Sequence, residues 1–330
     1  MLKAAVIGCG RMGSIHANSY ARGRRVRLAG VCDLDGDRVN AVAARTGVPG
    51  YTVLQQMLAA QRPDVVSVCT DAAHHLECVL PAIEAGAHVL CEKPMSGNVP
   101  DIETMIEAAD RRGVLLGANF NHRFARVAQT AKRRIMDGDI GDICFVNMWL
   151  TIAVTAEVSE YFHLRSLHGH SFDMLRYLAG EIRQVHGFLS RPPGRTFHSN
   201  CAVGMLFNNG AVGALVGSYD MSNVHPMERV EVGGTKGRLV LDNVTAGLTY
   251  YQHDRQEATV WTPVNYTRRD VQSEYDFNLT IDNRIEAFLD AVIHGNPDPA
   301  PARDALAATR LIEATIRSFE TGSVVTIDGS

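Results

Sequence analysis

The sequence lacks a surplus of positive charge. Its 330 residues carry 36 acidic side chains against 32 lysines and arginines, which gives a formal net charge of −4. Without a global positive field the chain does not attract a phosphate backbone, so we expect no nucleic-acid partner. The one notable basic cluster is interpreted as a solvated loop between a first helix and a second strand, and it comprises Arg22, Arg24, Arg25 and Arg27.

Long apolar runs and paired cysteine motifs are missing as well. No stretch approaches the roughly 18 apolar residues of a membrane span, and the chain enters a strand-like run at Leu2–Ile7 without a charged leader and cleavage site. The seven cysteines are odd in number and form no C-x-x-C pair, which argues against a disulfide framework and favours reduced, buried packing residues. We therefore expect a cytoplasmic protein with no membrane partner.

What is present is the composition of an ordinary globular protein. Apolar residues make up 46% of the chain and charged residues 21%, far from the polar, highly charged profile of disorder. At about 150 residues per domain the length predicts two domains, each large enough to bury its own core. Neither low-complexity sequence nor a fixed-period repeat is evident.

The first third of the chain alternates short apolar runs with helix-period stretches. This order is typical of repeated βαβ units and predicts a parallel sheet wrapped by helices. The strand-like runs are almost wholly apolar, as in Val65–Cys69, which is expected when both faces of a sheet are covered. The predicted strands are 2–7, 26–32, 65–69, 87–91 and 114–118, and the predicted helices lie near 11–21, 35–46, 73–85 and 98–110.

After about residue 120 the pattern changes to strands followed by helices. Turns such as Asn208–Gly210 join neighbouring strand-like runs in the manner of antiparallel hairpins. We predict an α+β domain built on a large open, mostly antiparallel sheet. Its expected strands are one ending near Leu150 and those at 182–190, 200–207, 211–219, 228–233 and 238–242, and its expected helices include 125–136, 278–294 and 302–318.

The first cofactor signal is a glycine-rich turn. Gly8-Cys9-Gly10-Arg11-Met12-Gly13 follows the first predicted strand directly and opens a helix. A dinucleotide site needs Gly8 for a tight turn, Gly10 where backbone approaches the pyrophosphate and Gly13 where helix meets strand, with helix N–H groups directed at the anion. The context of strand, turn and helix therefore predicts a Rossmann dinucleotide-binding domain.

An acid ends the second predicted strand, 20 residues beyond Gly13. We expect Asp33 to accept hydrogen bonds from both adenosine ribose hydroxyls and to repel a 2′-phosphate, which favours NAD over NADP. The alternative is that Asp33 is only a turn acid before Leu34–Gly36. Arg38 nearby keeps NADP open.

A lysine follows the predicted strand 87–91, within Cys91-Glu92-Lys93-Pro94. Proline cannot continue a central strand, so Lys93 is expected at the carboxyl edge of the sheet, where ligands of open α/β folds bind. An ammonium group there can polarise a substrate oxygen. The alternative of an ordinary rim lysine paired with Glu92 stays open from the residues alone.

A third constellation lies on a predicted amphipathic helix that ends at Gly180. The apolar face places His170 in the first turn, where the helix dipole disfavours imidazolium. A neutral His170 could accept a proton near pH 7, and Asp173 at i+3 lies close enough to orient its ring. The alternative is that His170 merely helps to cap the helix.

Three nearby histidines, His163, His168 and His170, also invite a metal interpretation, but we expect no metal. His168 and His170 would need an extended backbone to face one ion, no H-E-x-x-H or cysteine ligand set is present, and hydride transfer requires no metal.

These elements, in this order, resemble the Gfo/Idh/MocA (glucose-fructose oxidoreductase / inositol dehydrogenase) family over nearly the whole chain. The resemblance implies an NAD(P)-binding Rossmann domain at 1–120 and an α+β substrate-binding and oligomerisation domain at 121–330. Further stretches that carry it are Thr70 with His75, Gly86–Pro94, Phe120–Phe124, Gly233–Gly237 and Val324–Ile327.

The resemblance also implies an activity and a set of site residues. Lys93 and His170 would act on the reacting hydroxyl of a sugar, cyclitol or related polyol, and Asp173 matches the family's acid three residues on. A homodimer or homotetramer built on the open sheet is expected. The implied cofactor-binding residues are Gly8, Gly10, Arg11, Met12, Gly13, Asp33, Arg38, Thr70, His75, Glu92, Lys93 and Asn121.

The chain departs from the family pattern at two positions. Many members carry an aspartate four residues before the histidine and a glycine two before it, where this sequence has Ser166 and His168. Two alternatives to an NAD-dependent sugar or cyclitol dehydrogenase therefore stay open. One is an NAD-retaining glycosidase that uses transient oxidation and elimination, and the other is a non-catalytic NAD-dependent sensor.

Overall fold

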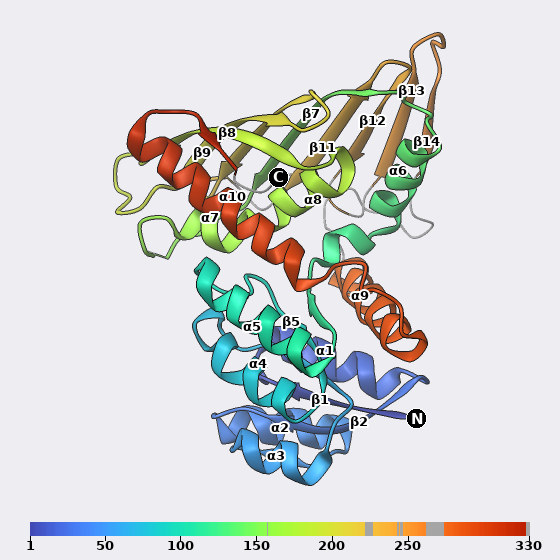
Figure 1. The fold of residues 1–330 in the computed structure, drawn as a ribbon, viewed down its shortest axis with the longest axis vertical. Helices are drawn as coiled ribbons and strands as arrows, with labels where there is room; N and C mark the ends of the chain where they lie inside the picture. Colours follow the sequence, from blue (N-terminus) through green and yellow to red (C-terminus); the bar gives the residue numbers. More distant parts are fainter. Residues whose placement is uncertain (157, 222–226, 243, 245–246, 262–273, 328–330) are drawn as a thin grey trace. The chain divides into compact units, whose positions relative to one another are not determined.

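A computed structural model describes residues 1–156, 158–221, 227–242, 244, 247–261 and 274–327. The chain divides into two compact units (Figure 1). The first contains Met1–Asn121 and Asn278–Ala307, and the second contains His122–Phe277 and Ala308–Ser330. Among the described residues, no helix combines the length and the hydropathy that crossing a membrane requires.

The first unit contains a six-stranded parallel sheet with the order β3-β2-β1-β4-β5-β6. This order is that of the doubly wound dinucleotide-binding fold, and the predicted parallel sheet is confirmed. The residues of β1 from Ala4 onward and all of β4 are buried, as expected for strands covered on both faces. The strands are β1 (Leu2–Ile7), β2 (Val26–Cys32), β3 (Gly50–Tyr51), β4 (Val65–Val68), β5 (His88–Cys91) and β6 (Leu116–Ala118).

Local sequence signals set the ends of the helices between these strands. The Asp35 side chain caps α2 by accepting from the N–H groups of Asp37 and Arg38, and Asn98 caps α5 through Asp101. Gly47 and Gly113 end the same two helices in the left-handed conformation. The helices are α1 (Arg11–Arg22), α2 (Gly36–Thr46), α3 (Leu54–Gln61), α4 (His75–Glu84) and α5 (Val99–Arg112).

A buried arginine explains why residues 278–307 group with the first unit, although the predicted division placed them in the second domain. Arg284, on α9 (Glu274–His294), is fully buried and makes two 2.7 Å bonds to the carboxylate of Asp298. It also donates to the carbonyl oxygens of Ala118 (2.9 Å) and Ala300 (3.1 Å). The segment after α9 is thereby fixed to the end of β6.

The second unit is built on a nine-stranded sheet with the order β14-β13-β12-β11-β7-β10-β9-β8-β15. Its neighbouring pairs are antiparallel except for β7 and β10, which run parallel, so the predicted mostly antiparallel sheet is confirmed. The strands are β7 (Ile143–Thr151), β8 (Ile182–Ser190), β9 (Asn200–Phe207), β10 (Val212–Ser218), β11 (Glu228–Gly234), β12 (Gly237–Asp242), β13 (Gly247–Gln252), β14 (Ala258–Trp261) and β15 (Val325–Thr326).

Helices cover one face of this sheet. Burial alternates along β9, which is the pattern of a sheet with one covered and one open face. On the covered side, α6 contacts β12 and β13, α8 contacts β7, and Ser318 of α10 accepts a 3.0 Å bond from the Gly187 N–H on β8. The helices are α6 (Arg126–Met136), α7 (Phe162–Leu167), α8 (Gly169–Ala179) and α10 (Ala302–Thr321) (Figure 1).

Candidate active site

The glycine turn between β1 and α1 has the geometry of a phosphate-binding loop. Gly8 has a φ of +90°, and a Cβ there would lie 2.6 Å from backbone atoms of Cys69; a Cβ on Gly13 would lie 1.7 Å from the Gly8 oxygen. The protein's own packing therefore demands both glycines. Among the residues that the structure describes, none comes within 4 Å of a Cβ placed on Gly10. The space at the N-terminus of α1 is thus open on the side where backbone N–H groups can bind an anion.

Asp33 lies beside this turn, at the end of β2. Its Oδ2 accepts a 2.6 Å bond from the Cys9 N–H, and its Oδ1 accepts a 2.9 Å bond from the Asp35 N–H. The side chain is half-buried, so the same carboxylate that closes the turn also faces solvent. The residues therefore fit the adenosine side of a bound dinucleotide.

Three further predicted cofactor residues lie on the first turns of α1 and α2. Arg11 is exposed and Met12 is half-buried, both in the first turn of α1. Arg38 is exposed and its Nε lies 3.3 Å from Oδ2 of Asp35. This ion pair holds the guanidinium beside Asp35, and a role for Arg38 toward NADP stays a prediction.

Glu92, at the end of β5, is the acceptor of a buried polar network. Its Oε1 accepts from Asn119 Nδ2 at 2.6 Å and lies 3.2 Å from His16 Nε2. The other ring nitrogen of His16 lies 2.9 Å from Ser67 Oγ, which also contacts the Tyr20 hydroxyl at 2.8 Å. Sequence reasoning missed His16, Ser67 and Asn119. The only sequence signal for these three residues is that each is a polar residue in a segment expected to be buried.

The network fixes the charge of Glu92. Burial alone would raise the pKa of this carboxyl, but hydrogen bonds from His16 and Asn119 and the charge of Lys93 more than offset burial and hold the pKa below its usual value. Glu92 therefore carries a negative charge within the first unit, directly before the lysine of the sequence motif.

Lys93 is half-buried and its backbone N–H donates to Oε2 of Glu92 at 3.1 Å. Burial lowers the pKa of the ammonium group, and the Glu92 carboxylate opposes this shift. The peptide bond between Lys93 and Pro94 is cis. An ammonium group with a lowered pKa exchanges a proton more readily than an exposed lysine, which suits a group at a reacting oxygen.

Thr70 and Asn121 lie on the connections that follow β4 and β6, and His75 is the first residue of α4. His75 is buried, with its ring nitrogens 3.0 Å from the Thr70 carbonyl oxygen and 3.1 Å from the Met95 carbonyl oxygen. Asn121 donates a 2.7 Å bond to Thr280 Oγ1 on α9. Both side chains fix the loops at the carboxyl edge of the sheet, and their predicted direct contact with a cofactor stays a prediction.

His170 lies in the first turn of α8, as predicted, and it is buried. Its ring stacks on that of His122, with centroids 3.9 Å apart and planes 6° apart. His122 Nδ1 lies 3.0 Å from Oε2 of Glu228, a buried carboxylate on β11. An ionised carboxylate only accepts, so this contact with ionised Glu228 requires a proton on His122 Nδ1. Sequence reasoning did not assign roles to His122 and Glu228, since 106 residues separate them.

Asp173 is buried one turn after His170 and is paired with an arginine. Its carboxylate accepts from Arg123 Nε at 2.6 Å and from a second nitrogen of the same guanidinium. The Arg123 guanidinium also lies over the Tyr177 ring, 5.3 Å from its centroid. Asp173 thus neutralises a buried cation, and its predicted part in orienting the His170 ring stays a prediction.

The predicted catalytic pair lies in different units. Lys93 belongs to the first compact unit and His170 to the second. Their convergence on one substrate oxygen therefore stays a prediction.

The strand order and the glycine turn together are those of a dinucleotide-binding protein with a second, α+β unit. Known proteins share this organisation. A family model described as "Oxidoreductase family, NAD-binding Rossmann fold" matches residues 2–120, and one described as "Oxidoreductase family, C-terminal alpha/beta domain" matches residues 132–327. The chain belongs to the Gfo/Idh/MocA family of oxidoreductases. It is an NAD(P)-dependent dehydrogenase or reductase that acts on CH–OH groups.

Individual relatives match along nearly their whole length. The myo-inositol 2-dehydrogenase of Thermotoga maritima is 28% identical, over 97% of this chain and 96% of that protein. The D-apiose dehydrogenase of Paraburkholderia graminis is 25% identical, over 98% of this chain and 89% of that protein. The crystal structure of a probable dehydrogenase from Thermotoga maritima is 26% identical, covers 99% of both chains and has a TM-score of 0.85.

Proposed function

We propose that the protein oxidises or reduces a secondary alcohol of a sugar, cyclitol or related polyol, with Lys93 and His170 acting on the hydroxyl. The observation that carries the proposal is Lys93 itself, half-buried after β5 with a lowered pKa and a fixed carboxylate beside it. The names of the relatives, myo-inositol 2-dehydrogenase and D-apiose dehydrogenase, support this substrate class.

NAD, when bound, supplies the hydride acceptor, and the chain's residues manage the proton and the developing charge. The glycine turn Gly8–Gly13 and Asp33 would hold the dinucleotide. In the oxidation direction, His170 accepts the proton of the hydroxyl while Lys93 stabilises the negative charge that develops on the oxygen. The carbon loses hydride as its bond to oxygen becomes a carbonyl, so the proton and the electron pair leave by separate routes.

The His122–Glu228 pair serves as a positioning device for His170 in this proposal. The stacked rings, 3.9 Å apart, restrict rotation of the His170 side chain. Glu228 in turn fixes the tautomer of His122. Ser166 stands where many family members have an aspartate, and in this proposal His122 takes part in orienting His170.

The proposal is tested by the kinetics of NAD reduction with a panel of sugars and cyclitols. Lys93→Ala and His170→Ala should each lower kcat/KM by a factor of about 10² to 10⁴, while NAD still binds. Matched controls are Lys236→Ala and His186→Ala, which change an exposed lysine and a half-buried histidine of the second unit. Unchanged turnover in both test variants would remove the assignment.

We also propose that the open sheet face joins two copies of the chain. Trp149, Val216, Ala202 and Phe188 are paired in register across β7, β10, β9 and β8. All four are exposed in the single chain, Phe188 by 62%. A contiguous apolar row of this kind is typical of a protein–protein interface.

A further inference from the structure

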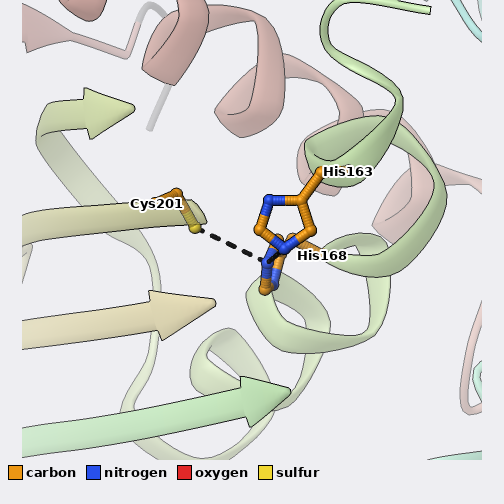
Figure 2. Close-up of side chains that lie close together, drawn as sticks. All are labelled: His163, His168 and Cys201. Atoms are coloured by element: carbon orange, nitrogen blue, oxygen red, sulfur yellow. Dashed lines mark hydrogen bonds between the residues drawn. The ribbon is translucent and has the colours of Figure 1, made fainter. Parts of the chain in front are cut away.

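Three donor side chains of the second unit lie together outside the site described above. His163 is on α7, His168 directly precedes α8, and Cys201 is on β9. Figure 2 shows the three side chains turned toward one another. His168 Nε2 lies 3.1 Å from His163 Nε2 and 3.5 Å from Cys201 Sγ, and all three donor atoms lie within 4.8 Å of one another.

We propose that His163, His168 and Cys201 form a binding site for a divalent transition metal ion, with zinc as the expected occupant. From the sequence, the candidate ligands are His163, His168 and His170, with no cysteine ligand set, and no metal is expected. In the structure the third donor near His163 and His168 is Cys201, which is 33 residues from His168 in sequence. The inference does not depend on the dehydrogenase mechanism.

Two of the three donor separations are near those of a tetrahedral site, and the third is within 4.8 Å. Zinc bond lengths of about 2.05 Å to imidazole and 2.3 Å to thiolate place two nitrogens about 3.3 Å apart and a sulfur about 3.6 Å from a nitrogen. The observed separations are 3.1 Å between the nitrogens and 3.5 Å between sulfur and nitrogen. Two imidazoles and one thiolate are a donor set that zinc prefers.

The surroundings hold the His168 ring over the sheet. Gly217 pairs with Cys201 in the register of β9 and β10, and a Cβ on Gly217 would lie 2.1 Å from His168 Nε2. The glycine is thus what leaves room for this ring. His168 Nδ1 lies 2.9 Å from Ser171 Oγ, which is the outer hydrogen bond that commonly fixes a metal-binding imidazole.

Hydrogen bonding places two possible donors at one lone pair of the cluster. If His163 Nε2–H donates to His168, the Cys201 thiol lies 3.5 Å from the same His168 lone pair. A cation among the three donors would remove this competition, because each donor then directs a lone pair at the metal. His163 Nδ1 is buried without a hydrogen-bond partner among the described residues in either case, so it does not distinguish the two arrangements.

The alternative of a nucleophilic cysteine is disfavoured. Cys201 is 4% exposed, so its sulfur is out of reach of a substrate in solvent. His163 and His168 are fully buried. Three protein donors leave one position of a tetrahedral ion for a further ligand, and a metal bound here would connect α7 and the start of α8 to β9.

The test measures metal in the purified full-length protein by mass spectrometry and then by Co²⁺ titration after removal of bound metal under reducing conditions. We expect about one equivalent per chain and a thiolate-to-cobalt charge-transfer band. We also expect Zn²⁺ to raise the Tm of metal-free protein by roughly 5 °C at 100-fold excess over Kd.

Variants assign the signal to the cluster. Cys201→Ser, which is nearly isosteric, should lose the cobalt band and the Tm shift, and His168→Gln should lower metal content. Cys144→Ser changes an exposed cysteine of the same unit and should retain all three signals. Cys69→Ser reports on the other group of candidate donors, His16, Cys69 and Glu92. Absence of bound metal in native protein and after refolding with Zn²⁺ would overturn the proposal, as would binding that survives Cys201→Ser.

Discussion

At the scale of single residues, the glycines of the turn Gly8–Gly13 are needed for two different reasons. Gly8 and Gly13 are required by contacts within the protein, since a Cβ on either would collide with backbone. Gly10 is not required by any protein atom within 4 Å. The space beside Gly10 is therefore open to a bound dinucleotide.

This difference predicts opposite outcomes for two alanine substitutions. Gly10→Ala should fold with nearly unchanged Tm but bind NAD at least about tenfold more weakly, a loss of ~1.4 kcal/mol, because its methyl group occupies the path of the pyrophosphate. Gly13→Ala should lower the free energy of unfolding by about 1–3 kcal/mol or more through steric overlap. Calorimetric NAD titration and thermal melts check both. Equal NAD affinity of Gly10→Ala and the parent chain would contradict the assignment.

At the scale of elements, the Glu92 network joins α1, β4, β5 and the residue after β6. His16 and Tyr20 lie on one side of α1, Ser67 lies on β4, and Asn119 follows β6. The helix whose N-terminus faces the phosphate site is thereby connected to the strand that carries Lys93. A substitution that displaces α1 should therefore also affect the position of β5, and the reverse.

The network predicts a pH dependence of stability. The pKa of Glu92 is lower in the folded state than its ordinary value, so around pH 4 the unfolded chain binds more protons, and stability rises with pH. The contribution is complete above the unfolded pKa, about 4.3, and is lost as pH falls through the lower folded value. Urea unfolding between about pH 3 and 6 should show a smaller slope for Glu92→Gln than for the parent chain.

The matched control for this measurement is Glu107→Gln, which changes an exposed glutamate of α5. Its profile should follow that of the parent chain, because an exposed ion pair contributes little. Superimposable profiles for Glu92→Gln and the parent chain would show that the carboxylate is not stabilised by its partners.

Sequence periodicity predicted most elements of the first unit but not all. β1, β2, β4, β5 and β6 fall on the predicted apolar runs. β3 has only two residues and forms through main-chain pairing with β2, and it is too short to leave a periodic pattern.

In the second unit, the sequence did not predict the parallel pairing of β7 with β10. The tertiary fold determines which strands pair, and the periodicity of each strand does not show its partner.

At the scale of the whole molecule, the open sheet predicts self-association. Trp149→Glu combined with Phe188→Glu places two charges in the exposed row and should convert a dimer or tetramer to smaller species. Light scattering after gel filtration measures the mass, and circular dichroism checks that the sheet persists. A control is Val260→Glu, an exposed position on β14 that is outside this row. A parent chain that is monomeric at micromolar concentration would rule out the interface.

The sequence by itself determined the class of the protein. Its signals are local: each lies within a short stretch of sequence whose backbone conformation depends on neighbouring residues. They are the turn Gly8–Gly13, Asp33 at the end of a strand, and Lys93 just after a strand. Only the tertiary structure brought His122 to Glu228, His16 to Glu92 and His168 to Cys201. These pairs bring together residues distant in sequence, and strand pairing and helix packing select such contacts without leaving a local signal.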